Sequence, residues 1–481
     1  MSVNTSSIMY TDVVGYSKLT GDNQELALII LEEHNEILKK YTEEYSGNTV
    51  KLTGDGLCAL FDNPIDSVKC AIDIQLALYR RNQLNTKERQ VRIRIGLHYG
   101  AYEYKNNDVF GDAVNIAKNI EPIAPYGGIA ISDVLSDLVS DEGNIYIREY
   151  KVLQLGDSQV KTYEVFLDLL TWLKNKNKQS LHTHDSEKMY IKAHNCFHDG
   201  DYSSAIKFAA IALESKSKNY NEIESFICNT LISLGELNYA KKMLSNIKLN
   251  CKDDLKLQAH IYKMEGHLSL NNSDLNSAKD LFFQSLQLMQ KTNTRYVNEL
   301  IYNVCITLLY NNENDQVISF LEQVIDVEND QYLLLVEGLK ILTLDSISAN
   351  ILESYIHKIN SSENSHFISL GFRVVTLIYI KIKNYNKAQE AIDYAQKKLK
   401  LSSKNISDSY QRKSFLEDVY VHRDIMNLSN KISDYFVEMT YNEVKDDNID
   451  SEIIIDSSFC TNCGFKNKKK FNFCVSCGNK L

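Results

Sequence analysis

The chain has 481 residues, of which 44% are hydrophobic and 24% are charged, and its net charge is −10. This length predicts roughly two to four domains, each able to bury a core, and the acidic balance argues against nonspecific nucleic-acid binding. The first five residues are polar and lack a basic start, and no apolar run approaches the roughly 20 residues needed to span a bilayer. We therefore expect a cytoplasmic protein without a membrane span.

The first 168 residues show short strand and helix patterns in turn. Alternating apolar residues predict strands at residues 8–16, 48–53, 57–61, 91–104, 129–131 and 162–166. Apolar residues at helical spacing predict helices at residues 23–45, 66–81 and 112–120. The order β-α-β-β-α-β predicts an α+β, ferredoxin-like domain with its helices on one face of the sheet.

A predicted β-hairpin at residues 48–61 holds a carboxylate in its turn, Gly54-Asp55-Gly56. The two glycines allow a ligand to approach the backbone closely. A second carboxylate, Asp12, ends the earlier apolar run at residues 8–11. Two aspartates at neighbouring strand ends are what a magnesium-nucleotide site requires. Alternatively, both aspartates are only turn residues.

Four motifs on these elements together resemble the class III adenylate/guanylate cyclase catalytic domain. They are residues 11–17 (TDVVGYS), 51–56 (KLTGDG), 94–100 (RIGLHYG) and 108–117 (DVFGDAVNIA). The resemblance covers residues 1–168 and rests on the order and spacing of the four motifs, because each alone is a weak signal.

The resemblance implies two metal ions, Mg²⁺ or Mn²⁺, in each active site. Their ligands would be Asp12 and Asp55, assisted by the backbone carbonyl of Val13. Carboxylates that clamp two metal ions can activate a ribose hydroxyl and stabilise the charge of pyrophosphate. The turn that follows leads toward a helix, so its N–H groups can hold phosphate; its residues are Val14, Gly15, Tyr16 and Ser17.

Lys51 and Asp108 occupy the positions at which members of this family select the base. A lysine that donates to adenine N1 and a carboxylate that accepts from the exocyclic amine form a complementary set. Taken singly, Lys51 could be a solvated strand lysine and Asp108 a helix-entry residue. Together they favour ATP and disfavour a guanylate cyclase.

The helix at residues 112–120 departs from the family pattern. Asn115 matches the asparagine that orients the ribose, but Asn119 stands where the family has a transition-state arginine. Lys118 is adjacent, about 100° round the helix, and is the nearest substitute. The family's phosphate-binding lysine falls near Gln154, where Lys151 or Lys161 could replace it.

The resemblance also implies a head-to-tail homodimer with two active sites at its interface. Asp12 and Asp55 of one chain would face Lys51, Asp108 and Asn115 of the other. An isolated monomer is then expected to be inactive.

A linker at residues 169–185 precedes a proline-free helical region at residues 186–443. The segments 200–206 and 235–240 echo each other, and weaker echoes occur at 273–278 and 383–388. The pattern resembles tetratricopeptide repeats, which stack into a solenoid and bind protein partners on a concave surface. The alternative is an irregular helical bundle.

An acidic linker at residues 444–458 leads to a short C-terminal segment, 459–481, with two Cys-x-x-Cys pairs. Four thiolates at this spacing predict a closed, structural zinc site of the zinc-ribbon type. The predicted ligands are Cys460, Cys463, Cys474 and Cys477.

The sequence thus predicts an adenylate cyclase that converts ATP to cyclic AMP and pyrophosphate and is regulated through its helical repeats. The alternative is a degenerate cyclase-like domain that binds nucleotide or only dimerises within a signalling scaffold. Asn119 is the residue that keeps this alternative open.

Overall fold

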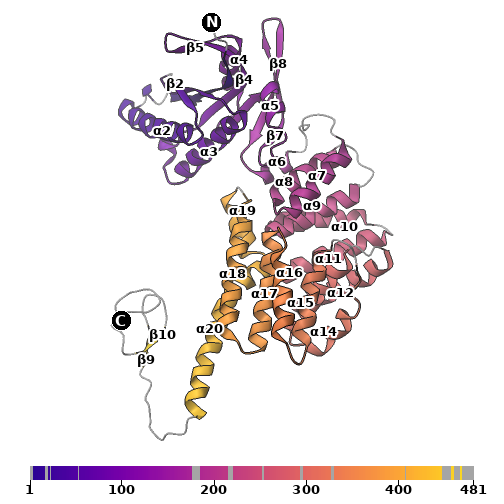
Figure 1. The fold of residues 1–481 in the computed structure, drawn as a ribbon. Helices are drawn as coiled ribbons and strands as arrows, with labels where there is room; N and C mark the ends of the chain where they lie inside the picture. The colour runs from indigo at the N-terminus through magenta and orange to yellow at the C-terminus, as the bar shows by residue number, and fades with distance from the viewer. Residues whose placement is uncertain are drawn as a thin grey trace. The chain divides into compact units, whose positions relative to one another are not determined.

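The structure is a computed structural model of the chain (Figure 1). It describes residues 4–16, 20–21, 23–52, 54–175, 185–214, 220–251, 254–292, 296–326, 330–406, 408–446, 457–459 and 466–468. The chain divides into two compact units, Met1–Ser429 and Asn430–Leu481. Each unit is described by itself below.

The N-terminal part of the first unit is built on a mixed β-sheet. Its strands are β1 (Asn4–Val13), β2 (Asn48–Leu52), β3 (Leu57–Phe61), β4 (Ile93–Lys105), β5 (Asp108–Phe110), β6 (Ile129–Ser132), β7 (Tyr146–Leu155) and β8 (Ser158–Phe166). The order across the sheet is β2-β3-β1-β4-β6-β8-β7, and β5 pairs with β4. Only the β4–β6 pair is parallel among the described strand pairs.

Helices cover both faces of this sheet. The helices of this part are α2 (Gln24–Glu44), α3 (Pro64–Gln83), α4 (Asp112–Ile120), α5 (Asp133–Val139) and α6 (Leu169–Lys174), with short 3-10 turns at Lys87–Arg89 and Glu121–Ile123. One core joins α2, α3 and α5 to residues such as Met9, whereas α4 packs with Ile8 and Tyr10. Because successive strand residues point to opposite faces, α4 lies on the other face. The prediction of helices on one face only is therefore wrong.

Two elements near the end of this part, β7 and α6, were not predicted from the sequence. Strand β7 is buried only over its first three residues, and its remainder alternates weakly among polar side chains. Helix α6 lies at the start of the expected linker, and Trp172 within it is 1% exposed and donates to the Ile147 carbonyl at 3.0 Å. The Arg148 guanidinium stacks over the same indole ring at 4.5 Å.

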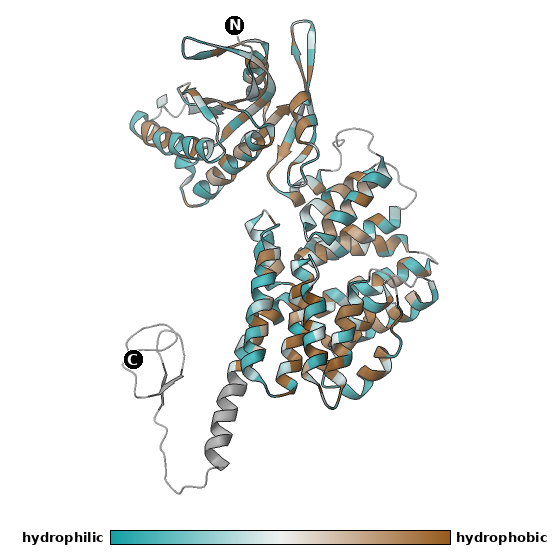
Figure 2. Cartoon of the chain, in the orientation of Figure 1, coloured by the Kyte–Doolittle hydropathy of each residue, from teal (hydrophilic) through white to brown (hydrophobic). Residues whose placement is uncertain are grey.

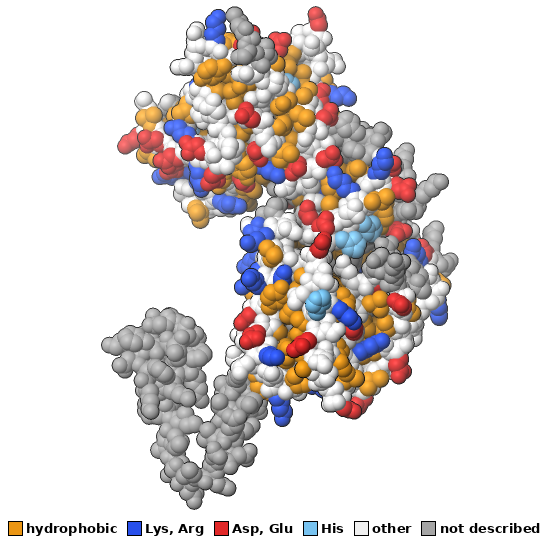
Figure 3. Space-filling model, viewed as in Figure 1, with side chains coloured by type: hydrophobic (Ala, Val, Ile, Leu, Met, Phe, Trp, Pro, Cys, Tyr) orange, Lys and Arg blue, Asp and Glu red, His pale blue; other side chains and the backbone are white. Residues whose placement is uncertain are grey.

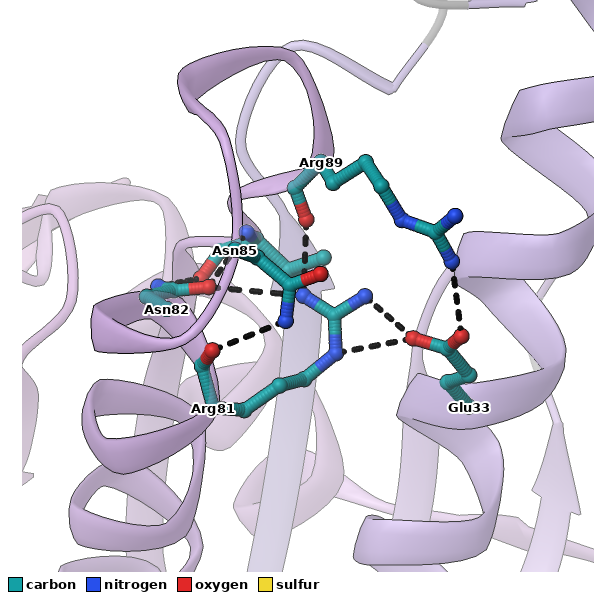
Figure 4. A network of polar contacts seen from close by, with 6 residues as sticks. Glu33, Arg81, Asn82, Asn85 and Arg89 are labelled. Atoms are coloured by element: carbon teal, nitrogen blue, oxygen red, sulfur yellow. Dashed lines mark hydrogen bonds and ion pairs between the residues drawn. The ribbon is translucent and has the colours of Figure 1, made fainter.

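A polar network fixes helix α2 to helix α3 (Figure 4). Glu33 accepts hydrogen bonds from Arg81 Nε at 2.9 Å and from Arg89 at 3.0 Å, and these guanidinium groups lower the pKa of Glu33. Arg81 also donates to the Arg89 carbonyl at 2.7 Å. Asn82 Nδ2 donates to the Val91 carbonyl at 2.6 Å, so the network also positions the segment that enters β4.

The rest of the first unit is helical, which confirms the all-helical class expected after residue 186. Its helices are α7 (Ser186–His198), α8 (Tyr202–Glu214), α9 (Tyr220–Leu234), α10 (Leu237–Asn250), α11 (Leu255–Asn271), α12 (Leu275–Thr292), α13 (Val297–Tyr310), α14 (Asn314–Leu321), α15 (Tyr332–Thr343), α16 (Ala349–Asn360), α17 (Ser365–Lys381), α18 (Tyr385–Ser403), α19 (Ser409–Glu417) and α20 (Tyr420–Asp446), which continues into the second unit. Hydrophilic and hydrophobic residues alternate along these helices (Figure 2), as in amphipathic packing. Their assignment as tetratricopeptide repeats stays a prediction.

The last helices return to the first ones. Asn364 donates to the His198 carbonyl at 2.5 Å, and Tyr202 lies 3.0 Å from His366. Arg423 at the start of α20 donates to the Asn271 carbonyl at 3.1 Å. The helical part therefore closes on itself, a feature that the repeat pattern does not predict.

In the second unit, β9 (Ser457–Phe459) and β10 (Lys466–Lys468) pair antiparallel. The four predicted zinc ligands, Cys460, Cys463, Cys474 and Cys477, lie outside the described residues, so the zinc ribbon stays a prediction. Within the described ranges, no helix has the length and apolar character that crossing a bilayer requires.

Burial of His34 in α2 makes the stability of the N-terminal part depend on pH. The side chain is fully buried, and burial lowers its pKa from 6.5 to about 4. Because the unfolded chain takes up this proton first, stability is lost as the pH falls below 6.5. Between pH 7 and pH 5 the native protein should lose about 2 kcal/mol more than a His34→Leu variant.

Urea unfolding followed through the fluorescence of Trp172, the single tryptophan, measures this difference. An equal loss of stability in the two proteins would contradict the buried, neutral state of His34.

Candidate active site

Asp12 lies near the end of β1, directly across the ladder from Arg94 in β4. Arg94 Nη2 donates to Asp12 Oδ2 at 2.5 Å. Arg94 Nε lies 2.9 Å from Glu121 Oε1 in an ion pair that lacks hydrogen-bond geometry. The Arg94 guanidinium thus interacts with two carboxylates, those of Asp12 and Glu121, at this edge of the sheet.

The turn that carries Asp55 is fastened beside Asp12. Gly54 has a φ of +84°, which favours glycine, and Leu57 begins β3 directly after the turn. The Leu57 N–H donates to the hydroxyl of Thr11 at 3.0 Å in a buried hydrogen bond. Because Thr11 precedes Asp12, this bond sets the two carboxylates in register.

The carboxylates of this site, Asp12, Asp55 and Glu121, repel one another. Burial raises the pKa of Asp55, the charge of Asp12 raises it further, and Arg94 opposes the rise. Burial also raises the pKa of Glu121 to about 7, opposed mainly by Arg94 and increased by Asp12 and Asp55. Three acids around one arginine leave an excess of negative charge, which a bound cation would relieve.

The donor set fits Mg²⁺, which prefers hard oxygen ligands and completes its shell with water and substrate phosphates. The side chains of Asp12 and Asp55 would supply two such ligands, and the carbonyl of Val13 is the third predicted donor. Over the described residues, no cluster of three or more His, Cys, Asp or Glu side chains is arranged to hold a metal alone. Water and, when a nucleotide is bound, its phosphates would complete the coordination shell of the metal.

The two predicted base-selecting residues meet on the same chain. Lys51 Nζ in β2 donates to both carboxylate oxygens of Asp108, at 2.5 and 2.6 Å. This contact lowers the pKa of Asp108, and the Val109 N–H also donates to the carboxylate. Both side chains stay about one third exposed, so a ligand can reach them.

The α4 residues stand apart from both groups. Asn115, Lys118 and Asn119 are exposed, and Asn119 Nδ2 donates back to the Asn115 carbonyl at 2.7 Å. Among the described residues, no hydrogen bond or ion pair joins these three side chains to Asp12, Asp55 or the Lys51–Asp108 pair.

The predicted phosphate-binding turn is described only in part. Val14 donates its N–H to the Arg92 carbonyl at 2.9 Å, which directs that group into the sheet and away from a ligand. Gly15 has a φ of +77° and is exposed, and Tyr16 packs against the core. Ser17 lies outside the described residues.

Sequence reasoning missed two residues of the acidic site, Arg94 and Glu121. Arg94 begins one of the four motifs, but its pairing with Asp12 depends on strand register. Glu121 reaches the site because Gly96 permits close approach: a Cβ there would lie 2.2 Å from the Glu121 nitrogen. The alternation of polar residues around Gly96 predicts a strand, but it does not predict that Glu121 packs against this glycine.

Comparison with known proteins supports the predicted resemblance for the N-terminal part. Residues 1–171 match the family model of the adenylate and guanylate cyclase catalytic domain. "Putative adenylate cyclase 3" of Rhizobium meliloti (strain 1021) is 30% identical over 168 residues, which are 35% of this chain and 28% of that protein. An "Adenylate cyclase" of Streptomyces griseus is 26% identical over 128 residues, 26% of this chain and 30% of that protein. The chain therefore spans less than a third of the length of these two relatives.

Solved structures also match this part. An adenylate/guanylate cyclase/hydrolase from Silicibacter pomeroyi is 26% identical, with 35% of this chain and 99% of that chain covered and a TM-score of 0.33. The adenylyl cyclase CyaB from P. aeruginosa is 21% identical, with 34% and 96% covered and a TM-score of 0.30.

Mg²⁺ should stabilise the N-terminal part by relieving the repulsion between Asp12 and Asp55. Added Mg²⁺ is expected to raise the unfolding temperature of the native protein at pH 8, and Asp55→Asn should remove most of the rise. Asp157→Asn, in an exposed turn, is the matched control and should keep it. An undiminished rise in the Asp55→Asn protein would show that the metal binds elsewhere.

Proposed function

We propose that the protein is an adenylate cyclase that converts ATP to cyclic AMP and pyrophosphate. The observation that carries the proposal is that one cyclase-like domain fastens the Asp55 turn beside Asp12 and pairs Lys51 with Asp108. These two pairs match the two ends of a nucleotide, a metal-bound triphosphate and a base.

Support for ATP over GTP comes from the Lys51–Asp108 pair. Its geometry holds an ammonium donor and a carboxylate acceptor side by side before any ligand arrives. Adenine offers the complementary edge, an acceptor at N1 beside an amine donor, whereas guanine offers a donor at N1 beside a carbonyl acceptor. Guanine would therefore face like groups at both positions.

The proposed reaction joins the ribose 3′-oxygen to the α-phosphorus and breaks the bond from that phosphorus to the oxygen bridging to the β-phosphate. Pyrophosphate leaves, and the hydroxyl proton passes to solvent. Bound metal ions would lower the pKa of the hydroxyl and neutralise the leaving charge. The task of Asp12 and Asp55 is to hold those ions, and Arg94 keeps Asp12 aligned toward them.

Catalysis is proposed to occur at a homodimer interface. Asn115 and Lys118 are exposed on α4 and form no hydrogen bond or ion pair with Asp12 or Asp55 of their own chain among the described residues. The ribose and phosphate contacts of one site would then come from α4 of the second chain. The homodimer is inferred from the family resemblance, and the lack of polar contacts between α4 and Asp12 or Asp55 of the same chain supports it.

Regulation through the helical part is proposed to act at helix α8. Buried Lys207 donates to the carbonyls of Ser140 and Glu142 at 2.9 and 2.5 Å. Glu214, the last residue of α8, pairs with Arg148 of β7 at 2.9 Å. Displacement of α8 would therefore pull on the sheet edge that carries β7. A Glu214→Gln change that leaves the cyclase rate and its response to effectors unaltered would argue against this route.

Purified protein with ATP and Mg²⁺ or Mn²⁺ should form cyclic AMP and should form little cyclic GMP from GTP. Asp55→Ala is expected to lower the rate by about 10²-fold or more, because it removes a ligand for the charge-stabilising metal. Asp157→Ala is the control and should retain the native rate. Tight ATP binding without any cyclic product would instead favour the degenerate, scaffold-type domain.

Asn119→Arg tests what limits the rate. An arginine here would supply a transition-state cation in place of an amide that bonds to the Asn115 carbonyl. The expected result is a rise in kcat of about 10²-fold with little change in KM, measured by steady-state assay with ATP. An unchanged kcat, with Lys118→Ala then abolishing activity, would assign the cationic role to Lys118.

A further inference from the structure

The closed helical part contains a cavity of about 500 Å³. Residues of α7, α9, α11 and α13 line one side, and residues of α17 and α20 line the other. This volume lies in the range typical of small-molecule sites. The Asn364–His198 and Tyr202–His366 bonds join the last helices to the first ones beside the cavity. The shape of the cavity therefore suits a compact molecule better than an extended peptide.

Aromatic rings dominate the walls of the cavity. Phe226 meets Tyr190 edge-on with 5.6 Å between ring centroids, and it lies 5.6 Å from Phe197 and 4.5 Å from His194. Further rings come from Tyr202, Tyr296, Tyr302, Tyr332 and Phe367. Faces and edges of such rings favour flat ligands and cations. Figure 3 shows histidine side chains beside hydrophobic ones on the surface of the helical part.

The charged residues that line the cavity are mostly acidic. Glu222, Glu299 and Asp330 face a single lysine among the described lining residues, Lys263, which already binds Glu299 at 3.0 and 3.2 Å. Glu222 also pairs at 3.6 Å with Lys256, which does not line the cavity, so the three acids still exceed the two lysines. Burial lowers the pKa of His260 to about 3, so its ring adds no positive charge at neutral pH. The cavity is therefore electronegative and favours a cation over an anion.

Two buried polar groups in the cavity wall lack a hydrogen-bond partner within the described part of the chain. They are Ser225 Oγ and Asn303 Nδ2, on side chains that are 4% and 7% exposed. Buried polar groups are nearly always satisfied, and an unsatisfied one costs stability. A ligand with a hydrogen-bond acceptor at its edge would satisfy Asn303.

We propose that this cavity binds one small organic cation that carries a flat ring system and a hydrogen-bond acceptor. Rings of α7 and α9 would stack on the ligand, the acidic residues would balance its charge, and Asn303 would donate to its edge. The site is independent of the nucleotide site, so its occupancy is measurable whether or not the protein forms cyclic AMP.

Berberine, a flat cation with ether oxygens, and 1-anilinonaphthalene-8-sulfonate, an aromatic anion, form a probe pair of opposite charge. Both change fluorescence on leaving water, so titration of the full chain measures both affinities. Berberine should saturate at one molecule per chain, and the anion should bind much more weakly. Equal or tighter binding of the anion, or no saturable berberine binding, would overturn the proposal.

Matched substitutions locate the site. Phe226→Leu should weaken berberine binding about tenfold, whereas Phe283→Leu, a ring on α12 outside the cavity, should leave it unchanged. Glu222→Gln, on a half-exposed side chain, removes charge without disturbing the core and should weaken berberine binding about threefold. Native affinity in both folded cavity variants would place the probe elsewhere and contradict the proposal.

Discussion

The arrangement of the N-terminal part depends on holding two mutually repelling carboxylates, Asp12 and Asp55, at one edge of a sheet. Asp12 lies on β1 and Asp55 in the turn between β2 and β3, and contacts around them keep them together against their repulsion. The bond from Leu57 to Thr11 fixes the turn against β1, and Arg94 offsets part of the negative charge. Burial raises the pKa of Asp55, and the negative charge of Asp12 adds to the rise. A cation bound between these two carboxylates would reduce their repulsion.

Helix α4 leaves the expected active site of a single chain incomplete. Gly100 in β4 lets this helix pack closely, since a Cβ there would lie 2.7 Å from the Ala113 Cβ. The packing buries one side of α4 and leaves Asn115 and Lys118 exposed. Each chain thus carries one proposed metal-binding pair and one proposed base-binding pair, while its groups expected at the ribose and phosphates are exposed on α4.

The sequence predicted the elements with strong periodicity and the residues within motifs. The bounds expected for α4 agree with the structure, and those for α2 and α3 differ by one or two residues at each end. It missed β7, whose outer half lacks a regular alternation of buried apolar residues, and the second covered face of the sheet. Arg94 and Glu121 were missed because their roles arise from strand register and from the space left by Gly96. The closure of the helical part depends on long-range bonds such as that between Tyr202 and His366, which no local pattern encodes.

The central claim is that one active site needs Asp55 of one chain and Asn115 of another. The most direct measurement is the cyclic AMP formed by a mixture of two variants, Asp55→Ala and Asn115→Ala, each inactive alone. Random reassociation makes about half of the dimers mixed, with one intact site of two, so the mixture should recover roughly a quarter of the native rate. A mixture as inactive as its components, with exchange of chains demonstrated, would contradict the account.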